Sequence, residues 1–195
     1  MNSEWDEYAK NWDVDPQVEK YAESAFSALT QKVDLTGLSV LDFGCGTGAL
    51  TKRLSDKAKE VVAIDPSSEM IKFLEQKSLN NVSAISEYLN ASLIEVNPLF
   101  KNKFDLITAS SVCSFLPDYE GTLKLLYCLL KPGGTFIQWD WLDNDETTAF
   151  GLPVNRVESA LEANGFSNIQ VITPFIMSSS KGEMPVLMGV GTRLT

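Results

Sequence analysis

Three glycines alternate with other residues in one short stretch of the chain. Gly44, Gly46 and Gly48 follow the apolar run Val40–Phe43, in which Asp42 is the only carboxylate. Glycine permits positive φ, and a ligand can approach its main chain closely because it has no Cβ. The residues after the loop have the apolar spacing of a helix, whose first N–H groups lack partners within the helix. The stretch therefore predicts a strand, a loop that binds a phosphate or a nucleoside, and the start of a helix.

The loop by itself leaves the ligand open. Gly44, Gly46 and Ala49 also satisfy the looser pattern G-x-G-x-x-A, which is typical of NAD and FAD sites. A glycine-rich turn without a ligand is a third interpretation. A second buried strand, Glu60–Asp65, ends in a carboxylate that can accept hydrogen bonds from both hydroxyls of a ribose. Asp65 supports a nucleoside, but it does not discriminate, because an NAD site uses an acid about 20 residues after its glycines.

Three segments together resemble a known family. The pattern Asp-x-Gly-x-Gly-x-Gly at residues 42–48 resembles the first motif of the class I S-adenosylmethionine-dependent methyltransferases. Phe104–Ile107, followed by small residues and by Phe115–Asp118, is similar to their fourth motif. Leu129–Ile137, with Pro-Gly-Gly at its centre, resembles the turn before their fifth strand, and this turn favours a methyltransferase over a dehydrogenase. The resemblance covers most of residues 37–195.

The resemblance implies a fold and an activity. The fold is α/β, a three-layer sandwich around a Rossmann-like, mostly parallel seven-stranded sheet in the order 3-2-1-4-5-7-6, with the last strand antiparallel; the alternation of strands and helices indicates the same layers. The activity is transfer of a methyl group from S-adenosylmethionine to a small-molecule acceptor, leaving S-adenosylhomocysteine. Residues 1–36 are then an N-terminal helical lid, and residues 37–195 are the cofactor-binding part of a single-domain protein.

The apolar patterns and turn residues predict the individual elements. Strands are expected at Ser39–Phe43, Glu60–Asp65, Asn81–Ser86, Phe104–Ala109, Ile169–Phe175 and Met184–Gly191, and the last two are joined by a turn at Ser178–Glu183. Helices are expected at Pro16–Gln31, Gly48–Lys57, Tyr119–Leu130 and Pro153–Asn164, with Gly165 as the C-terminal cap of the last one. Another helix is expected to start at Pro66–Met70, with Ser67 or Ser68 as its N-terminal cap.

On the resemblance, the residues that contact the cofactor lie at the carboxyl edge of the sheet. The glycine loop meets the amino-acid part and Asp65 meets the ribose. Glu87 takes the place of the acid that meets adenine, where Asp is more usual, and a solvated acid in a loop is an equally good interpretation of it. The whole predicted set is Asp42, Gly44, Cys45, Gly46, Gly48, Asp65, Pro66, Met70, Glu87, Ala109 and Ser110.

Aromatic residues gather in two segments that are expected to face an acceptor. In residues 1–36 they suit either the buried side of an amphipathic helix or a lid over the cofactor, and the two interpretations are compatible. Residues 139–146 are expected to form a loop rich in carboxylates, which favours a neutral or cationic acceptor, and a solvated acidic loop is the alternative. Cys113 either lines the pocket or is a buried structural thiol. The substrate-side candidates are Tyr8, Trp12, Tyr21, Cys113, Trp139, Asp140 and Trp141.

Composition excludes several other classes of protein. The 195 residues fit one domain, and the absence of histidine removes Ser-His-Asp and Cys-His nucleophilic machinery. Three cysteines far apart have neither disulfide nor metal-ligand spacing, so we predict no metal site. A net charge of −10 without a Lys/Arg cluster makes nucleic acid and anionic membranes poor partners. The N-terminus has no basic flank and no apolar run of a secretion signal, so we expect a cytoplasmic protein.

No side chain is predicted to be obligatory for the chemistry. The sulfonium of the donor already activates the methyl carbon, so in-line displacement requires alignment and exclusion of water. If the acceptor must lose a proton, Asp140, Glu87 or water after the transfer is the available base. Two other functions stay open: an NAD(P)-dependent oxidoreductase, and a module that binds the cofactor without turnover. The residues do not specify the acceptor, the atom methylated or the oligomeric state.

Overall fold

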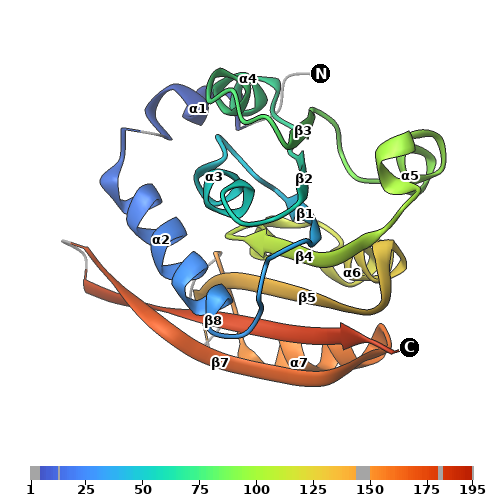
Figure 1. The fold of residues 1–195 in the computed structure, drawn as a ribbon. Coiled ribbons are helices and arrows are strands. Elements are labelled where there is room, and N and C mark those ends of the chain that lie inside the picture. Colours follow the sequence, from blue (N-terminus) through green and yellow to red (C-terminus); the bar gives the residue numbers. More distant parts are fainter. Residues whose placement is uncertain (1–4, 13, 144–149, 180–181, 195) are drawn as a thin grey trace. The chain divides into compact units, whose positions relative to one another are not determined.

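The computed structural model describes residues 5–12, 14–143, 150–179 and 182–194. The chain divides into two compact units, Met1–Asn102 and Lys103–Thr195, and each contains both strands and helices (Figure 1).

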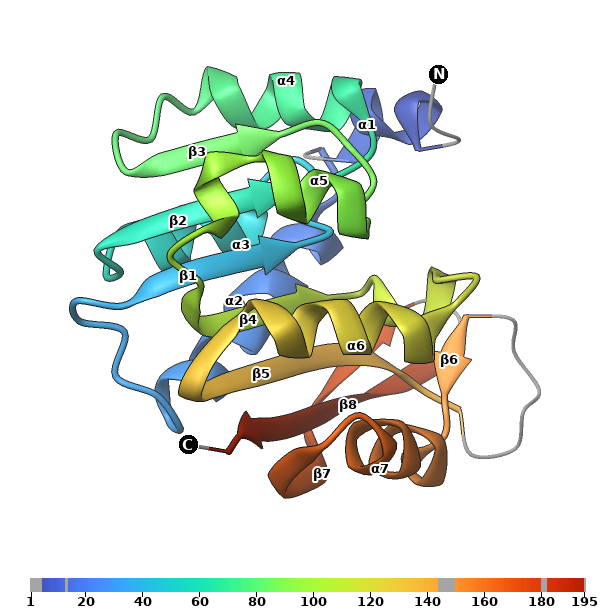
Figure 2. The same cartoon turned by 90° about the vertical axis from the view of Figure 1, so that its right-hand side faces the viewer.

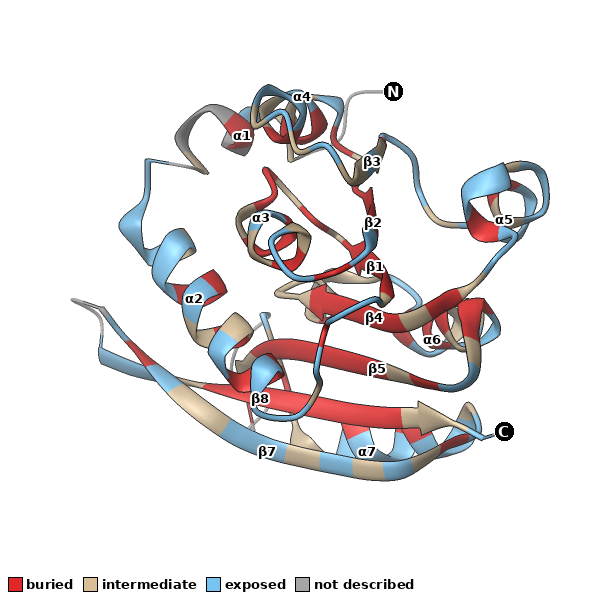
Figure 3. Cartoon of the chain, in the orientation of Figure 1, coloured by how far each residue is buried: buried red, intermediate tan, exposed pale blue. Residues whose placement is uncertain are grey.

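Three parallel strands form the sheet of the first unit. β1 (Ser39–Phe43) pairs with β2 (Glu60–Ile64), and β2 pairs with β3 (Val82–Ile85). All of β1 is buried, and so is β2 after Glu60, as the red colour of β1 in Figure 3 illustrates. Because both faces of these strands are covered, they read in the sequence as continuous apolar runs. The order 3-2-1 predicted for this half is confirmed.

Helices join these strands and precede them. α3 (Ala49–Ser55) connects β1 to β2, and α4 (Ser68–Gln76) connects β2 to β3. α4 begins where the sequence predicts it, because Ser67 Oγ accepts a hydrogen bond from the Met70 N–H at 3.1 Å.

The two helices before β1 pack on the helices that follow it. α2 (Pro16–Thr30) packs against α3, and α1 (Asp6–Trp12) packs against α4. α2 has the predicted start, since Asp15 caps it by accepting the Gln17 N–H at 2.8 Å. α1 is not predicted, and neither are α5 (Ala91–Val96) and the short 3-10 helix η1 (Pro98–Phe100).

The second unit contains the remaining strands. β4 (Phe104–Ser110) pairs in parallel with β5 (Leu130–Leu142), and β8 (Gly182–Arg193) lies antiparallel between β5 and β7 (Phe166–Ser179). This order corresponds to the predicted 4-5-7-6, including the antiparallel last strand. A two-residue strand, β6 (Gly151–Leu152), pairs with β5 and brings the strands in the described ranges to eight, one more than predicted.

The helices of the second unit follow the prediction closely. A 3-10 turn, η2 (Cys113–Phe115), and then α6 (Tyr119–Leu129) connect β4 to β5. α7 (Val154–Ala163) precedes β7, and Gly165, with φ of 85°, follows its end as expected for a helix stop.

The loop predicted at Trp139–Glu146 is wrong for its first four residues. β5 continues to Leu142, because β8 pairs with it as far as the partners Trp141 and Val186. Trp139, Asp140 and Trp141 therefore stand in a strand, while residues 144–146 lie outside the described ranges.

Two further element boundaries differ from the prediction. Pro-Gly-Gly at 132–134 is not a separate turn but an irregularity within β5, across which the pairing with β4 shifts. Gly133 has φ of 78° there, so the unusual backbone angle expected of these residues is confirmed, whereas the expected separate turn is wrong. The final hairpin is also longer than predicted, because Ser178 still pairs with Glu183 where a turn was expected.

Candidate functional site

The glycine loop after β1 has a backbone that only glycine adopts easily. Gly44, Gly46 and Gly48 have φ of 70°, 53° and 88°, all in the left-handed region. The N–H groups of Gly44 and Cys45 both donate to the Ile64 carbonyl, at 2.8 and 3.2 Å. These bonds fasten the loop to the carboxyl end of β2.

Two of the glycines are required for different reasons. A Cβ at Gly48 would lie 2.4 Å from Leu74 Cδ1, so packing against α4 requires glycine there. A Cβ at Gly46 would meet nothing nearer than Trp12 Nε1, at 3.8 Å. This is an ordinary van der Waals distance, so packing alone would tolerate a Cβ at Gly46, and glycine there lets a ligand approach the main chain closely. The loop therefore fits the amino-acid part of a nucleoside cofactor.

Both oxygens of the Asp65 carboxylate accept backbone hydrogen bonds, and one of these bonds holds the glycine loop. Oδ2 accepts the Gly46 N–H at 3.0 Å, and Oδ1 accepts the Ser67 N–H at 2.9 Å. Burial raises the pKa of Asp65, the two N–H groups oppose that rise, and the nearby Asp6 carboxylate adds to it. Each carboxylate oxygen has a second lone pair, so Asp65 can accept ribose hydroxyls while it positions the loop.

Asp42 and Cys45, both predicted to contact the cofactor, are buried beside the loop. Asp42 Oδ2 accepts the Thr51 hydroxyl at 2.6 Å, which links β1 to α3. Burial raises the pKa of the Cys45 thiol, with Asp65 and Asp42 adding to the rise, so the sulfur stays protonated. The sequence analysis did not identify Thr51 as the partner of Asp42. The available signal was the position of Thr51 in the first turn of the helix that follows the glycine loop.

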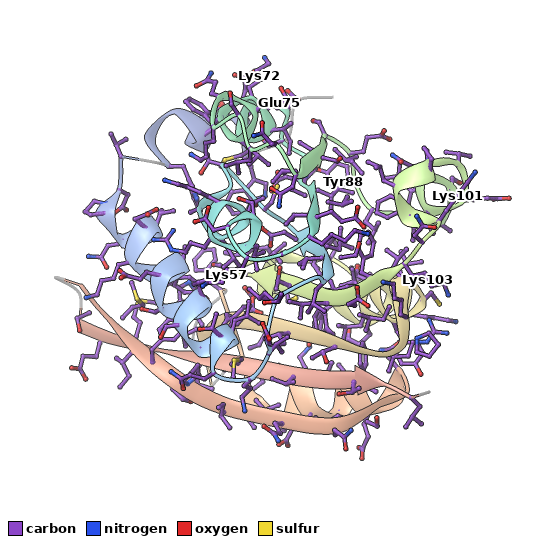
Figure 4. The ribbon with its side chains drawn as sticks, viewed as in Figure 1. Lys57, Lys72, Glu75, Tyr88, Lys101 and Lys103 are labelled. Atoms are coloured by element: carbon purple, nitrogen blue, oxygen red, sulfur yellow. The ribbon has the colours of Figure 1, made fainter. Side chains whose placement is uncertain are left out.

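The other predicted cofactor contacts in this unit lie around α4 and β3. Pro66 precedes the helix cap, and Met70 is buried. Glu87 is exposed on the loop after β3, next to Tyr88, whose side chain is 65% exposed and is labelled in Figure 4. The predicted contact of Glu87 with adenine stays a prediction.

The aromatic candidates near the N-terminus have different surroundings. Trp12 is partly buried and lies over Gly46, as the 3.8 Å distance above shows. Tyr21 is buried within α2. The backbone of Tyr8 belongs to α1, and its side chain lies outside what the structure describes.

In the second unit, β4 ends at the predicted Ala109 and Ser110. Ala109 is buried and Ser110 is half-buried. The next residue, Ser111, has φ of 56°, and its N–H donates to the Trp139 carbonyl at 2.7 Å. A left-handed conformation costs a residue with a Cβ about 1–2 kcal/mol. Such strain at a strand end is typical of functional positions, and sequence reasoning missed Ser111.

A chain of buried hydrogen bonds leads to Asp140 in the same unit. The Tyr119 hydroxyl donates to Gln138 Oε1 at 2.7 Å, and Gln138 Nε2 donates to Asp140 Oδ2 at 2.9 Å. Asp140 Oδ1 accepts the Ser114 N–H at 3.0 Å. Burial raises the pKa of Asp140 to about 7, although hydrogen bonds from Ser114, Gln138 and the Cys113 N–H oppose the rise.

Asp140 is thus a buried acid that titrates near neutral pH. Gln138 and Tyr119 were missed from the sequence. The signal was available, because residues two apart in a strand share a face, and Gln138 and Asp140 are two apart in β5.

The remaining substrate-side candidates of this unit are largely buried. Trp139 is fully buried, and its indole Nε1 has no hydrogen-bond partner among the described residues. Trp141 is half-buried. Cys113 is buried, and burial followed by the charge of Asp140 raises the pKa of its thiol, in keeping with the structural interpretation. Contact of these residues with an acceptor stays a prediction.

Among the curated proteins similar to this chain are methyltransferases named for quinones. Demethylmenaquinone methyltransferase of Lactococcus lactis is 35% identical over 107 residues, which are 53% of this chain and 42% of that protein. Ubiquinone biosynthesis O-methyltransferase of Xanthomonas campestris is 32% identical over 127 residues, 64% of this chain and 53% of that protein. The chain spans about half the length of these curated relatives.

Comparison with solved structures shows the fold. The structure of DhpI in complex with SAH has a TM-score of 0.75 at 21% identity, covering 97% of this chain and 93% of that one. The predicted α/β, Rossmann-like fold with a mostly parallel sheet is therefore confirmed. No helix in the part of the chain that the structure describes has the length and hydropathy to cross a bilayer.

A family model described as "Methyltransferase domain" matches residues 41–138, half of the chain. The matched span begins in β1 and ends in β5, so it includes the glycine loop, Asp65 and all of β4. The resemblance carried by the glycine motif and by the segments around β4 is confirmed, and the chain belongs to this family of methyltransferase domains.

Proposed function

We propose that this protein transfers a methyl group from S-adenosylmethionine to a small-molecule acceptor and releases S-adenosylhomocysteine. The observation that carries the proposal is the carboxylate of Asp65, which holds Gly46 and Ser67 by their N–H groups at 3.0 and 2.9 Å and keeps lone pairs for ribose hydroxyls. Membership of the family and the names of the curated relatives support the same activity.

Different segments of the chain bind different parts of the donor in this proposal. The backbone of Gly44–Gly48 receives the amino-acid part, Asp65 the ribose, and the loop at Glu87 the adenine, while Ala109 and Ser110 face the methionine part. When bound, S-adenosylmethionine supplies a methyl carbon that its sulfonium has already activated. The protein must then align the acceptor and exclude water, which needs no particular catalytic side chain.

Residues 1–36 act as a lid in this proposal, and residues 37–195 are the cofactor-binding domain. The position of Trp12 over Gly46 supports the lid. The carboxylates of the segment 139–146 and the net charge of −10 support an acceptor that is neutral or cationic. Where the acceptor must lose a proton, Asp140 or Glu87 is the available carboxylate.

The proposed setting is the cytoplasm, without nucleic acid or membrane as a partner. Three free thiols, Cys45, Cys113 and Cys128, support a reducing compartment. The net charge of −10 opposes binding to phosphate backbones and anionic lipids.

Calorimetric titration of the protein with S-adenosylmethionine, S-adenosylhomocysteine and NADH tests the cofactor. We expect micromolar binding of the first two and none of NADH, and preferential binding of NADH would contradict the proposal in favour of an oxidoreductase. A panel of phenols, amines and dicarboxylates, assayed for S-adenosylhomocysteine release, tests the acceptor. Neutral and cationic acceptors should react and dicarboxylates should not; binding without turnover of any acceptor would indicate a module that only holds the cofactor.

A further inference from the structure

One face of α1 is apolar at helical spacing. Trp5 lies immediately before the helix. Ala9 and Trp12, within the helix, come four and seven residues after Trp5. Ala9 is 1% exposed, and the rings of Trp5 and Trp12 meet edge to face with their centroids 6.2 Å apart. Figures 1 and 2 both show α1 beside α4. Seven residues are too few for a helix that is stable alone in water, so α1 depends on this packing.

Asp6 fixes the first turn of α1 to the first turn of α4. The Ser67 hydroxyl donates to Asp6 Oδ1 at 2.6 Å, and the Glu69 N–H donates to the same oxygen at 3.5 Å. Ser67 Oγ in turn accepts the Met70 N–H at 3.1 Å. The carboxylate therefore stands at the N-terminal end of α4, where the helix dipole favours negative charge.

Ser67 connects this attachment to the ribose-binding acid. Its hydroxyl donates to Asp6, and its backbone N–H donates to Asp65 at 2.9 Å. At the far end of α1, the Trp12 indole lies 3.8 Å from the position of a Cβ on Gly46. A single short helix thus meets the donor loop through one aromatic ring and is attached beside Asp65 through one carboxylate.

We propose that Asp6 is a positioning residue for the donor: its hydrogen bond with Ser67 holds α1 over the glycine loop, so that Trp12 covers the amino-acid end of the bound cofactor. The inference rests on the proposed function and adds to it the residue that fastens the lid. Asp6 acts through Ser67 and Trp12, so its loss should change how long the cofactor stays bound more than it changes the Asp65 contacts themselves.

The test uses S-adenosylhomocysteine as the probe and two readouts that do not depend on turnover. Stopped-flow displacement gives its dissociation rate, and hydrogen exchange gives the protection of amides 6–12 and 44–48. Asp6→Ala should speed dissociation by about five- to tenfold, since it removes a charge-assisted hydrogen bond from a partly exposed position. Asp6→Asn keeps an acceptor oxygen and should fall between Asp6→Ala and the native protein.

Two further variants show whether Asp6 acts through Ser67. Glu7→Ala is the matched control, because it removes a neighbouring exposed carboxylate of the same helix. S-adenosylhomocysteine should dissociate from this variant at the native rate. In a Ser67→Ala background, Asp6→Ala should add little, because its partner is already gone.

Hydrogen exchange separates the inference from the function on which it rests. With saturating S-adenosylhomocysteine, the native protein should protect both the glycine loop and α1, whereas Asp6→Ala should protect the glycine loop alone. Native protection of α1 in Asp6→Ala, or equal effects of Asp6→Ala and Glu7→Ala, would overturn the role of Asp6 and leave the proposed function standing. No protection of the glycine loop in the native protein would instead overturn the proposed function.

Discussion

Replacing Asp140 by Asn is expected to stabilise the protein at neutral and alkaline pH and to change little at acid pH. Asp140 is 0% exposed, and burial raises its pKa from 3.8 to about 7. In the unfolded chain the same carboxyl ionises near its ordinary pKa of about 4. Between these two values the unfolded state has released a proton that the folded state still holds. Stability contributed by the protonated acid is therefore full below about pH 4 and is lost as the pH rises to about 7.

The size of the effect follows from the pKa shift. A rise from 3.8 to about 7 corresponds to about 4 kcal/mol of stability lost across the window, at about 1.4 kcal/mol per pKa unit. Asn can keep the hydrogen bonds of Asp140. Its oxygen accepts the Ser114 N–H, and if the Gln138 amide turns over, the Asn NH₂ donates to Gln138, whose own NH₂ donates to the Tyr119 hydroxyl. The hydroxyl then accepts a hydrogen bond instead of donating one, so its own proton loses Gln138 Oε1 as an acceptor. A protonated Asp140 that donates to Gln138 requires the same arrangement in the native protein, so the two proteins remain comparable at acid pH.

Urea unfolding of both proteins at several pH values between about 4 and 8 measures this difference. We expect Asp140→Asn to gain about 2–4 kcal/mol at pH 8 and to match the native protein near pH 4. Glu162→Gln, on the exposed side of α7, is the control and should show no such trend. A difference that stays constant with pH, or a variant less stable than the native protein at pH 8, would refute a buried acid that titrates near neutrality.

Three other predictions concern the glycine loop and its acid. Gly46→Leu should abolish detectable binding of S-adenosylhomocysteine in calorimetry, because its side chain would stand in the proposed path of the cofactor, while its backbone strain costs about 1–2 kcal/mol of folding free energy and its Cβ would lie at van der Waals distance from Trp12; undiminished binding would contradict the proposed path of the cofactor. Gly48→Ala should instead lower the free energy of unfolding by about 2–4 kcal/mol in urea, because it adds a steric clash with α4 to a φ of 88°; a fully stable variant would show that the loop adjusts freely. Asp65→Ala should lower the affinity for S-adenosylhomocysteine by about 100-fold, because two hydrogen bonds to a charged group are lost. A loss of affinity of less than about threefold would exclude Asp65 as the acceptor of the ribose hydroxyls.

The first half of the site was predictable because its signals are local. The β1 strand, the glycines and the acid after β2 lie within residues 39–65. The glycines indicate the backbone conformation of the loop, and the apolar residues indicate that the strands are buried. Ser67 was likewise placed as a cap from its own neighbourhood. Burial of both faces makes such strands continuous in apolar residues, so their boundaries are clear in the sequence.

The parts that the sequence did not reveal depend on distant partners. α1 is too short to be stable alone, and the hydroxyl that Asp6 accepts comes from Ser67, 61 residues later. The end of β5 carries acids that are typical of a loop, yet Trp141 pairs with Val186 of β8, which begins 40 residues beyond β5. The hydrogen bonds that begin at Asp140 likewise pass through Gln138 to Tyr119 of α6, a distant partner that the pattern Trp-Asp-Trp does not reveal.

The two buried acids differ in what holds them, and this difference suits them to different tasks. Backbone N–H groups hold both oxygens of Asp65, and a backbone N–H cannot become an acceptor, so these hydrogen bonds favour the ionised form that accepts ribose hydroxyls, against the burial that raises the pKa of the acid. One oxygen of Asp140 faces the side-chain amide of Gln138, which can turn and present its oxygen to a protonated carboxyl. Asp65 is therefore built to keep one charge state, whereas Asp140 has partners for both. If either acid exchanges a proton during turnover, the hydrogen bonds assign that step to Asp140.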